Sequence, residues 1–181
     1  MTRIFRKLFR RSRREDGSAT IEFVILFPLF IYVISSAFDA SLMTTRQAML
    51  TGAVDRAVRD LQLGNLGSPT VAQLKSHICN LAEVIPECDE RLSIEMERIS
   101  KTSWSFRTGR VECVDVEEDT TPALTFQNGS SNDLMLLTVC AAARPIVPNI
   151  GFGLRMPKIN GINGGKYYGI IAMSAYVVEP A

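Results

Sequence analysis

The feature that most constrains this chain is an uncharged, mostly apolar run of sixteen residues, Phe23 to Phe38, that follows a basic N-terminus. Residues 1–16 hold seven cations and two anions, whereas the remaining residues hold 13 cations and 17 anions. A helix that starts at Ser18 and ends at Phe38 has 21 residues and rises about 31 Å, which matches the hydrocarbon thickness of a bilayer. Cations precede this segment, so the basic end is expected to stay in the cytoplasm. The sequence therefore predicts one membrane span.

Two other interpretations of this run are a buried core helix and a cleaved secretory signal peptide. A core helix carries its apolar residues on one stripe, whereas residues 23–38 are apolar around the whole circumference. A signal peptide would be cut near Ser35-Ser36-Ala37. That interpretation gives no role to Glu22, and the helical pattern continues past Ala37 without a break. The alternative function is a bitopic or secreted envelope binding domain whose N-terminal helix is only an anchor or a signal.

A short motif lies where the basic stretch meets the apolar run. The motif begins with Gly17 and Ser18 and ends with Glu22 and Phe23. Pro28 lies early in the apolar run that follows. The pattern resembles the class III signal of type IV pilin-like proteins. It is most similar to TadE-like pseudopilins of tight-adherence (Tad, or Flp) pili, and the sister TadF-like family shares it. The resemblance is strong over residues 10–40 and extends to about residue 63.

The resemblance implies a processing site and an assembly site. Prepilin peptidase would cut after Gly17, a residue that lets the backbone enter a narrow cleft in extended form, and the helix would be retained with Ser18 as its new terminus. Glu22, next to Phe23, would pair with the terminal ammonium of a neighbouring subunit, in a low-dielectric setting that strengthens the pair. The simpler interpretation is that Glu22 is a first-turn acid favoured by the helix dipole. Pro28 is expected to kink the helix or free backbone groups.

The resemblance also implies a location and a set of partners. It describes a minor pseudopilin that crosses the bacterial inner membrane once. Its N-terminus would be cytoplasmic and its C-terminal domain periplasmic or extracellular, and the protein could be incorporated in the pilus. The implied partners are prepilin peptidase, other pilins and pseudopilins, inner-membrane pilus assembly proteins and membrane lipid. Nucleic acid is not expected, because the basic stretch precedes a membrane segment. No enzyme motif is present in the sequence, so we expect a protein that is not an enzyme and needs no cofactor.

The rest of the chain predicts an α+β fold. Apolar residues recur at three- and four-residue steps as far as Leu63, so the helix is expected to leave the membrane and bury a stripe made of Leu42, Met49, Leu50, Ala53, Val54, Ala57, Val58 and Leu61. The expected segments are a cleaved leader (1–17), an assembly helix (18–40), its extracytoplasmic half (41–63) and a globular domain (64–181). Ser68-Pro69 predicts the start of a second helix that ends at Pro86.

Period-two patterns follow the second helix and predict an antiparallel sheet. The expected strands are Leu92–Met96, Trp104–Phe106, Val111–Cys113, Leu134–Ala143 and Tyr167–Val178, with a long loop from Pro145 to Gly165. A helix followed by such strands favours helices packed on one sheet.

The four cysteines all lie in the part expected outside the cytoplasm, which favours disulfides. Four cysteines allow three pairings, and the sequence does not choose among them. We favour Cys79–Cys88 across the Pro86 turn and Cys113–Cys140 between strands. A metal site made of His77, Cys79 and Cys88 has no common zinc spacing, so no metal is expected there. His77 is expected on a helix surface. The acidic run Asp115–Asp119 is a weak candidate for a calcium site, because it lacks the residue order of an EF-hand loop.

Overall fold

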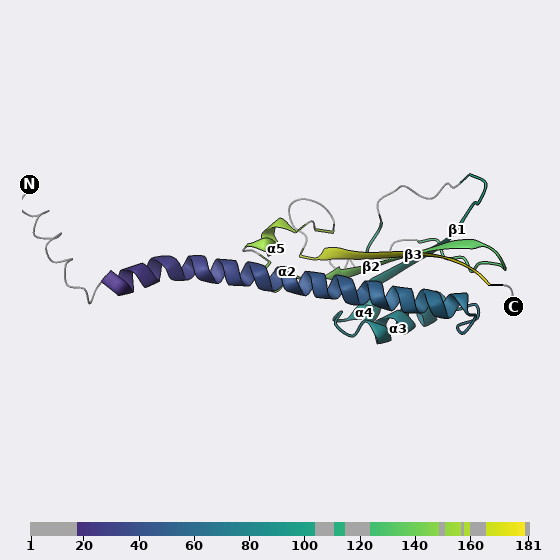
Figure 1. The fold of residues 1–181 in the computed structure, drawn as a ribbon, viewed down its shortest axis with the longest axis horizontal. Helices are drawn as coiled ribbons and strands as arrows, with labels where there is room; N and C mark the ends of the chain where they lie inside the picture. Colours follow the sequence, from purple (N-terminus) through teal and green to yellow (C-terminus); the bar gives the residue numbers. More distant parts are fainter. Residues whose placement is uncertain are drawn as a thin grey trace, which may run out of the picture.

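The structure, a computed structural model, describes residues 18–103, 111–114, 124–148, 151–156, 158–159 and 166–179. Its elements in chain order are α2 (Ser18–Gln62), α3 (Val71–Leu81), α4 (Cys88–Arg91), β1 (Leu92–Ile99), β2 (Leu134–Ala143), α5 (Phe152–Arg155) and β3 (Tyr168–Val177). Figure 1 shows a long rod, α2, whose second half carries a compact head, while its first half projects from that head. The predicted α+β class is confirmed.

Helix α2 is one element of 45 residues, about 68 Å long at the usual helical rise. Its second half buries most of the predicted stripe, because small and branched apolar residues at this spacing fit against a sheet. The buried members are Leu50, Ala53, Val54, Ala57, Val58 and Leu61. Leu42 is half-buried. Met49 was wrongly placed in the stripe: its side chain is 42% exposed, because it lies one residue off the face that meets the head.

Helix α3 begins and ends inside the predicted range. Its N-cap is Thr70 rather than Ser68, because Thr70 and Gln73 form a reciprocal capping box. The Gln73 amide donates to Thr70 Oγ1, and the Thr70 amide donates to Gln73 Oε1. The helix stops at Leu81, well before Pro86. Leu74 and Ile78 are buried within the helix, whereas Val71 is 39% exposed.

The sheet has three antiparallel strands in the order β1-β2-β3. Its middle strand has the predicted bounds, and β3 differs from the prediction by one residue at each end. The predicted strand at Val111–Cys113 is wrong, because residues 111–114 take no strand conformation. The predicted strand at Trp104–Phe106 lies outside the described residues. Within the predicted loop from Pro145 to Gly165, the chain forms the short helix α5.

The core lies between one face of the sheet and the two longer helices. Central side chains include Leu50 of α2, Ile78 of α3 and Leu137 of β2, each fully buried. Tyr176 of β3 is also buried in this layer, where desolvation raises its pKa, and its hydroxyl donates to Met96 Sδ.

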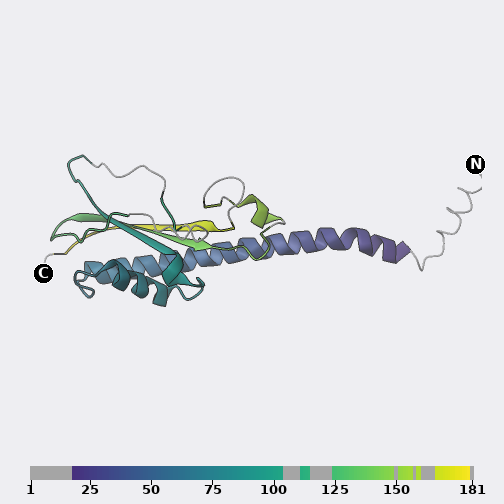
Figure 2. The same cartoon turned by 180° about the vertical axis from the view of Figure 1, so that it is seen from behind.

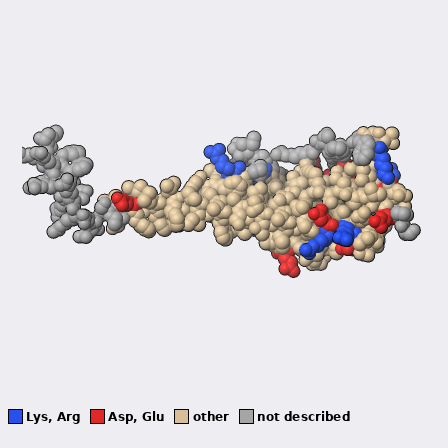
Figure 3. Space-filling view, in the orientation of Figure 1, with Lys and Arg blue, Asp and Glu red and all other residues tan. Residues whose placement is uncertain are grey.

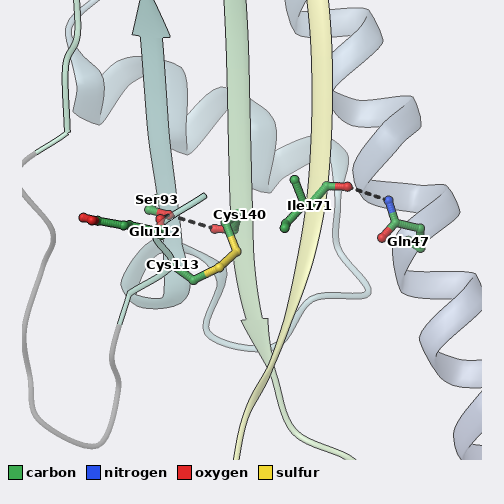
Figure 4. Close-up of a disulfide and its surroundings, with 6 residues drawn as sticks. All are labelled: Gln47, Ser93, Glu112, Cys113, Cys140 and Ile171. Atoms are coloured by element: carbon green, nitrogen blue, oxygen red, sulfur yellow. Dashed lines mark hydrogen bonds between the residues drawn. A yellow bond between two sulfur atoms is a disulfide. The ribbon is translucent and has the colours of Figure 1, made fainter. Parts of the chain in front are cut away.

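Polar contacts fix the head to the second half of α2. Gln47 Nε2 donates to the carbonyl of Ile171 at 2.8 Å, as Figure 4 shows. The residue before it, Arg46, donates to the Arg144 carbonyl at 3.0 Å and to the Tyr168 hydroxyl at 3.1 Å. These bonds satisfy groups on β3, the strand that contacts α2, and just after the end of β2, and so fix the position of the head along α2.

Two disulfides tie segments without regular secondary structure to the helices and the sheet. Cys79 and Cys88 form one, and Cys113 and Cys140 form the other, which are the two pairs favoured above. The second ties residues 111–114 to the central strand β2. Beside it, the Ser93 hydroxyl lies 3.0 Å from the Glu112 carbonyl and 3.3 Å from the Cys140 carbonyl (Figure 4). The disulfide therefore compensates for the missing strand pairing.

Candidate functional site

The first half of α2 is an apolar rod, and from Ile21 to Ile34 no other described part of the chain buries it. Its large apolar side chains are 44–68% exposed, and they are Ile21, Phe23, Val24, Ile25, Leu26, Phe27, Leu29, Phe30, Ile31, Tyr32, Val33, Ile34 and Phe38. Among the described residues, α2 is the one helix long and apolar enough to cross a membrane. So much apolar surface is unfavourable in water, so the rod requires lipid or other apolar helices around it.

One carboxylate, Glu22, interrupts this apolar surface near its start. Glu22 is exposed, and it is the one acidic residue between Ser18 and Phe38. Figure 3 shows an isolated acidic patch at the start of the rod, followed by an uncharged surface as far as the head. The neighbouring Phe23 is 61% exposed, and its ring stacks on Phe27 with 5.0 Å between the ring centroids. A charge in this position is costly in lipid unless it finds a cationic partner.

Of the other motif residues, the structure describes Ser18 and Pro28 but not Gly17. Ser18 is the first residue of α2, four positions before Glu22, so the chain terminus created by a cut after Gly17 would lie one turn from the carboxylate. Gly17 and the basic leader lie outside the described residues. Pro28 lies inside α2, which continues through it as one helix. Because proline has no amide hydrogen, it leaves the Val24 carbonyl without its helical donor.

A second feature, which the sequence did not predict, lies where the apolar rod meets the head. Asp39 directly follows the apolar run and is 2% exposed. Its Oδ1 accepts a hydrogen bond from the Ile146 amide at 2.9 Å, and its Oδ2 accepts one from the Val147 amide at 3.4 Å. Those partners are more than a hundred residues away along the chain, so no local pattern reports them. The available signal was an acid placed immediately after an apolar run within a continuing helix.

Two glycines let the following loop approach α2 closely at this junction. A Cβ at Gly151 would lie 2.1 Å from Ser36 Oγ, and Gly151 has a φ of 63°, which favours glycine. A Cβ at Gly153 would lie 2.2 Å from the Val147 carbonyl oxygen and 3.3 Å from Asp39 Oδ2. The junction is therefore tightly packed, with helix α5 held against the last turn of the apolar rod.

We predict that Asp39→Ala loosens this junction without unfolding the head. The change removes the carboxylate that accepts from the amides of Ile146 and Val147, and hydrogen bonds to a charged group contribute about 1.5–3 kcal/mol. Hydrogen exchange of these two amides should accelerate by roughly one to two orders of magnitude, while amides of β2 keep their protection. The control Asp39→Asn retains one acceptor oxygen and should show a smaller effect. Unchanged exchange in Asp39→Ala would show that the contact does not hold the loop.

The structure does not assemble the metal site weighed in the sequence. Cys79 and Cys88 are bonded to each other, so neither offers a thiolate. His77 instead contacts Asp60 of α2, with 3.0 Å between Nε2 and Oδ2, and so links α3 to the spine. Within the described ranges, no group of three or more His, Cys, Asp or Glu side chains is arranged to hold a metal ion. The acidic run Asp115–Asp119 lies outside those ranges.

The geometry defines a class of protein: a head-and-spine subunit whose single apolar helix projects from the head with one carboxylate near its end. Residues 17–59 match the family model described as TadE-like protein, which confirms the resemblance read from the sequence. The N-terminal segment of this chain is therefore TadE-like, and the family suggests a component associated with the Tad pilus. TadE-like pilus components are structural proteins rather than enzymes. Comparison with curated proteins and with solved structures gave no match.

Proposed function

We propose that this protein is a minor, pseudopilin-like component of Tad pilus biogenesis that is cut by prepilin peptidase and assembles through α2. Residues 1–17 are the leader, residues 18–40 the membrane and assembly helix, and residues 41–63 the extracytoplasmic half of the spine. Residues 64–181 are the globular domain. The proposed partners are the peptidase, other pilins and pseudopilins, the inner-membrane assembly proteins and lipid.

The observation that carries this proposal is the exposed apolar half of α2 with Glu22 near its end. Lipid alone satisfies the apolar side chains but leaves the carboxylate without a counter-charge. A neighbouring subunit cut after its own glycine supplies both an apolar helix and a terminal ammonium. Pairing Glu22 with that ammonium, such as the amine of a second Ser18, satisfies the carboxylate at the depth where the helices meet.

The charge distribution supports an inner-membrane orientation for the same helix. The cations of residues 1–16 precede the apolar run, which favours an orientation with that end in the cytoplasm and the head in the periplasm or beyond. The two disulfides of the head fit an oxidising compartment. After cleavage, the assembled protein would carry a formal charge of −4 instead of the precursor's +1, because the leader removes the cationic excess.

Cleavage after Gly17 is the first testable step of this proposal. Mass spectrometry of the protein extracted from membranes should show Ser18 as the terminal residue, with or without added methyl groups. The change Gly17→Lys, or loss of the peptidase, should leave the leader attached, whereas the control Arg14→Lys should be cut normally. A terminus at Phe38 would contradict the proposal and favour the alternative in which the helix is an export signal.

A protein that uses α2 only as an anchor is the alternative function, and the exposed apolar helix fits it as well. The two differ at Glu22. An anchor gains nothing from a carboxylate in the apolar run, so removal of the charge should leave it functional or better inserted.

A further inference from the structure

We propose that the loop around α5 is a membrane foot: an interfacial surface that contacts anionic phospholipid of the leaflet facing the head. The membrane foot consists of the described residues 144–148, 151–156 and 158–159. This inference rests on the part of the proposed function in which the apolar half of α2 spans a bilayer.

The position of the membrane foot follows from its contacts with α2. Gly151 packs against Ser36, and Asp39 binds the amides of Ile146 and Val147. Ser36 lies two residues before the end of the apolar run at Phe38, a distance of about 3 Å along the helix. Figures 1 and 2 both show α5 at the end of the head nearest the projecting rod. If Phe38 lies at the edge of the hydrocarbon, the membrane foot lies in the headgroup layer.

The membrane foot exposes apolar side chains at this level. Leu154 is 61% exposed, Ile146 is 56% exposed and Phe152 is 38% exposed. Ile146 lies in the segment that Asp39 binds, and Phe152 and Leu154 belong to α5, which contacts α2, so these side chains lie beside the end of the apolar rod. A head that needed only to stay in water would not place three large apolar side chains beside the membrane surface.

The charges of the membrane foot favour an anionic surface. The membrane foot holds three cations, Arg144, Arg155 and Lys158, and no acid, although residues 17–181 as a whole carry net negative charge. Arg155 ends α5 and is exposed, next to Leu154. Figure 3 shows cationic atoms over this part of the molecule. Apolar side chains flanked by cations are the composition that binds the interface of a bilayer containing anionic lipid.

The membrane foot is also held rigidly enough to insert. Lys158 Nζ donates to the Gly153 carbonyl at 2.9 Å, which closes the short helix onto the chain that follows it. Together with the two bonds to Asp39, this contact ties α5 and the segment before it to the rest of the chain while Leu154 and Phe152 stay exposed. A surface that is already ordered binds without the entropy loss of folding a loop.

Depth-resolved tryptophan quenching of the full chain tests this inference. The single natural tryptophan, Trp104, is first replaced by Phe. Three reporters are then compared: Leu154→Trp in the membrane foot, Leu29→Trp in the apolar rod and Met173→Trp as a control. Met173 is 55% exposed and so resembles Leu154, but it lies about 20 Å beyond the end of the apolar run, by the rise of α2 from Phe38 to Gln47 and of β3 beyond Ile171. Each protein is reconstituted in phosphatidylcholine–phosphatidylglycerol vesicles with or without brominated acyl chains.

We expect Leu154→Trp to emit at shorter wavelength than Met173→Trp and to lose emission when the bromine lies near the headgroup end of the acyl chains. Replacing phosphatidylglycerol by phosphatidylcholine, or adding Arg155→Glu, should reduce that quenching. If Leu29→Trp is quenched but Leu154→Trp behaves like the control, the membrane foot is overturned while the span stands. A blue-shifted but unquenched Leu154→Trp would assign this surface to a protein contact and also overturn it. An unquenched Leu29→Trp would overturn the span itself.

Discussion

Cells that carry Glu22→Ala should cut the leader and insert the protein, yet fail to incorporate it into the pilus system. The carboxylate lies at the exposed start of α2, surrounded by apolar side chains, so its loss leaves the fold of the head untouched. It does remove the counter-charge for a neighbouring terminal ammonium. Leaving a charge unpaired in an apolar setting costs about 3–5 kcal/mol, equivalent to a loss of more than about a hundredfold in association.

Two variants at the same position separate charge from size. Glu22→Gln keeps the length and polarity of the side chain and should fail as Glu22→Ala does, whereas Glu22→Asp keeps the charge and should retain part of the function. Pilus yield and the amount of this subunit in assembly complexes are the measurements, with terminal mass as the control for cleavage. Normal assembly with Glu22→Ala would favour the anchor function.

Replacing Cys113 and Cys140 together by Ser should destabilise the head by about 3–4 kcal/mol, because this disulfide closes a loop with a sequence separation of 27 residues. The bond also joins a segment with no strand pairing of its own to the buried centre of the sheet. Space around the sulfurs is already filled: a Cβ at Gly169 would lie 2.9 Å from Cys113 Sγ and 3.3 Å from Cys140 Sγ.

The disulfide between Cys79 and Cys88 provides a matched comparison. These residues are nine apart in the sequence, so replacing both by Ser should lower the free energy of unfolding by about 1 kcal/mol less than removal of the disulfide that closes the longer loop. Urea-dependent proteolysis of the full chain in detergent measures both effects as shifts of the unfolding midpoint. Equal midpoints for the wild type and the Cys113 and Cys140 variant would show that residues 111–114 are not held by this bond.

The sequence predicted those elements whose residues carry a strong period. The stripe on α2 and the bounds of β2 follow from spacing alone, because one face of each must be buried. The start of α3 was wrong because two capping signals competed. Ser68-Pro69 has the usual order, but only Thr70 is followed three residues later by a glutamine that completes the box.

The junction at Asp39 shows what sequence patterns do not report. The carboxylate accepts hydrogen bonds from backbone amides near the other end of the chain, and a backbone amide has no residue identity to recognise. The same holds for Arg46, whose acceptor at Arg144 is also a carbonyl. By contrast, Glu22 could be singled out, because a lone acid in an apolar run is unusual whatever surrounds it.

The central proposal, that Glu22 meets the new terminus of a neighbouring subunit, can be tested directly by crosslinking. A membrane-permeant carbodiimide joins a carboxylate to an amine in contact, and mixing light and heavy isotope-labelled subunits distinguishes links between chains from links within one. We predict linked peptides that join Glu22 to the Ser18 amine of a second copy, or to the terminal amine of another pilin. Assembled pili in which Glu22 is linked to no amine, or only to Ser18 of its own chain, would contradict the account.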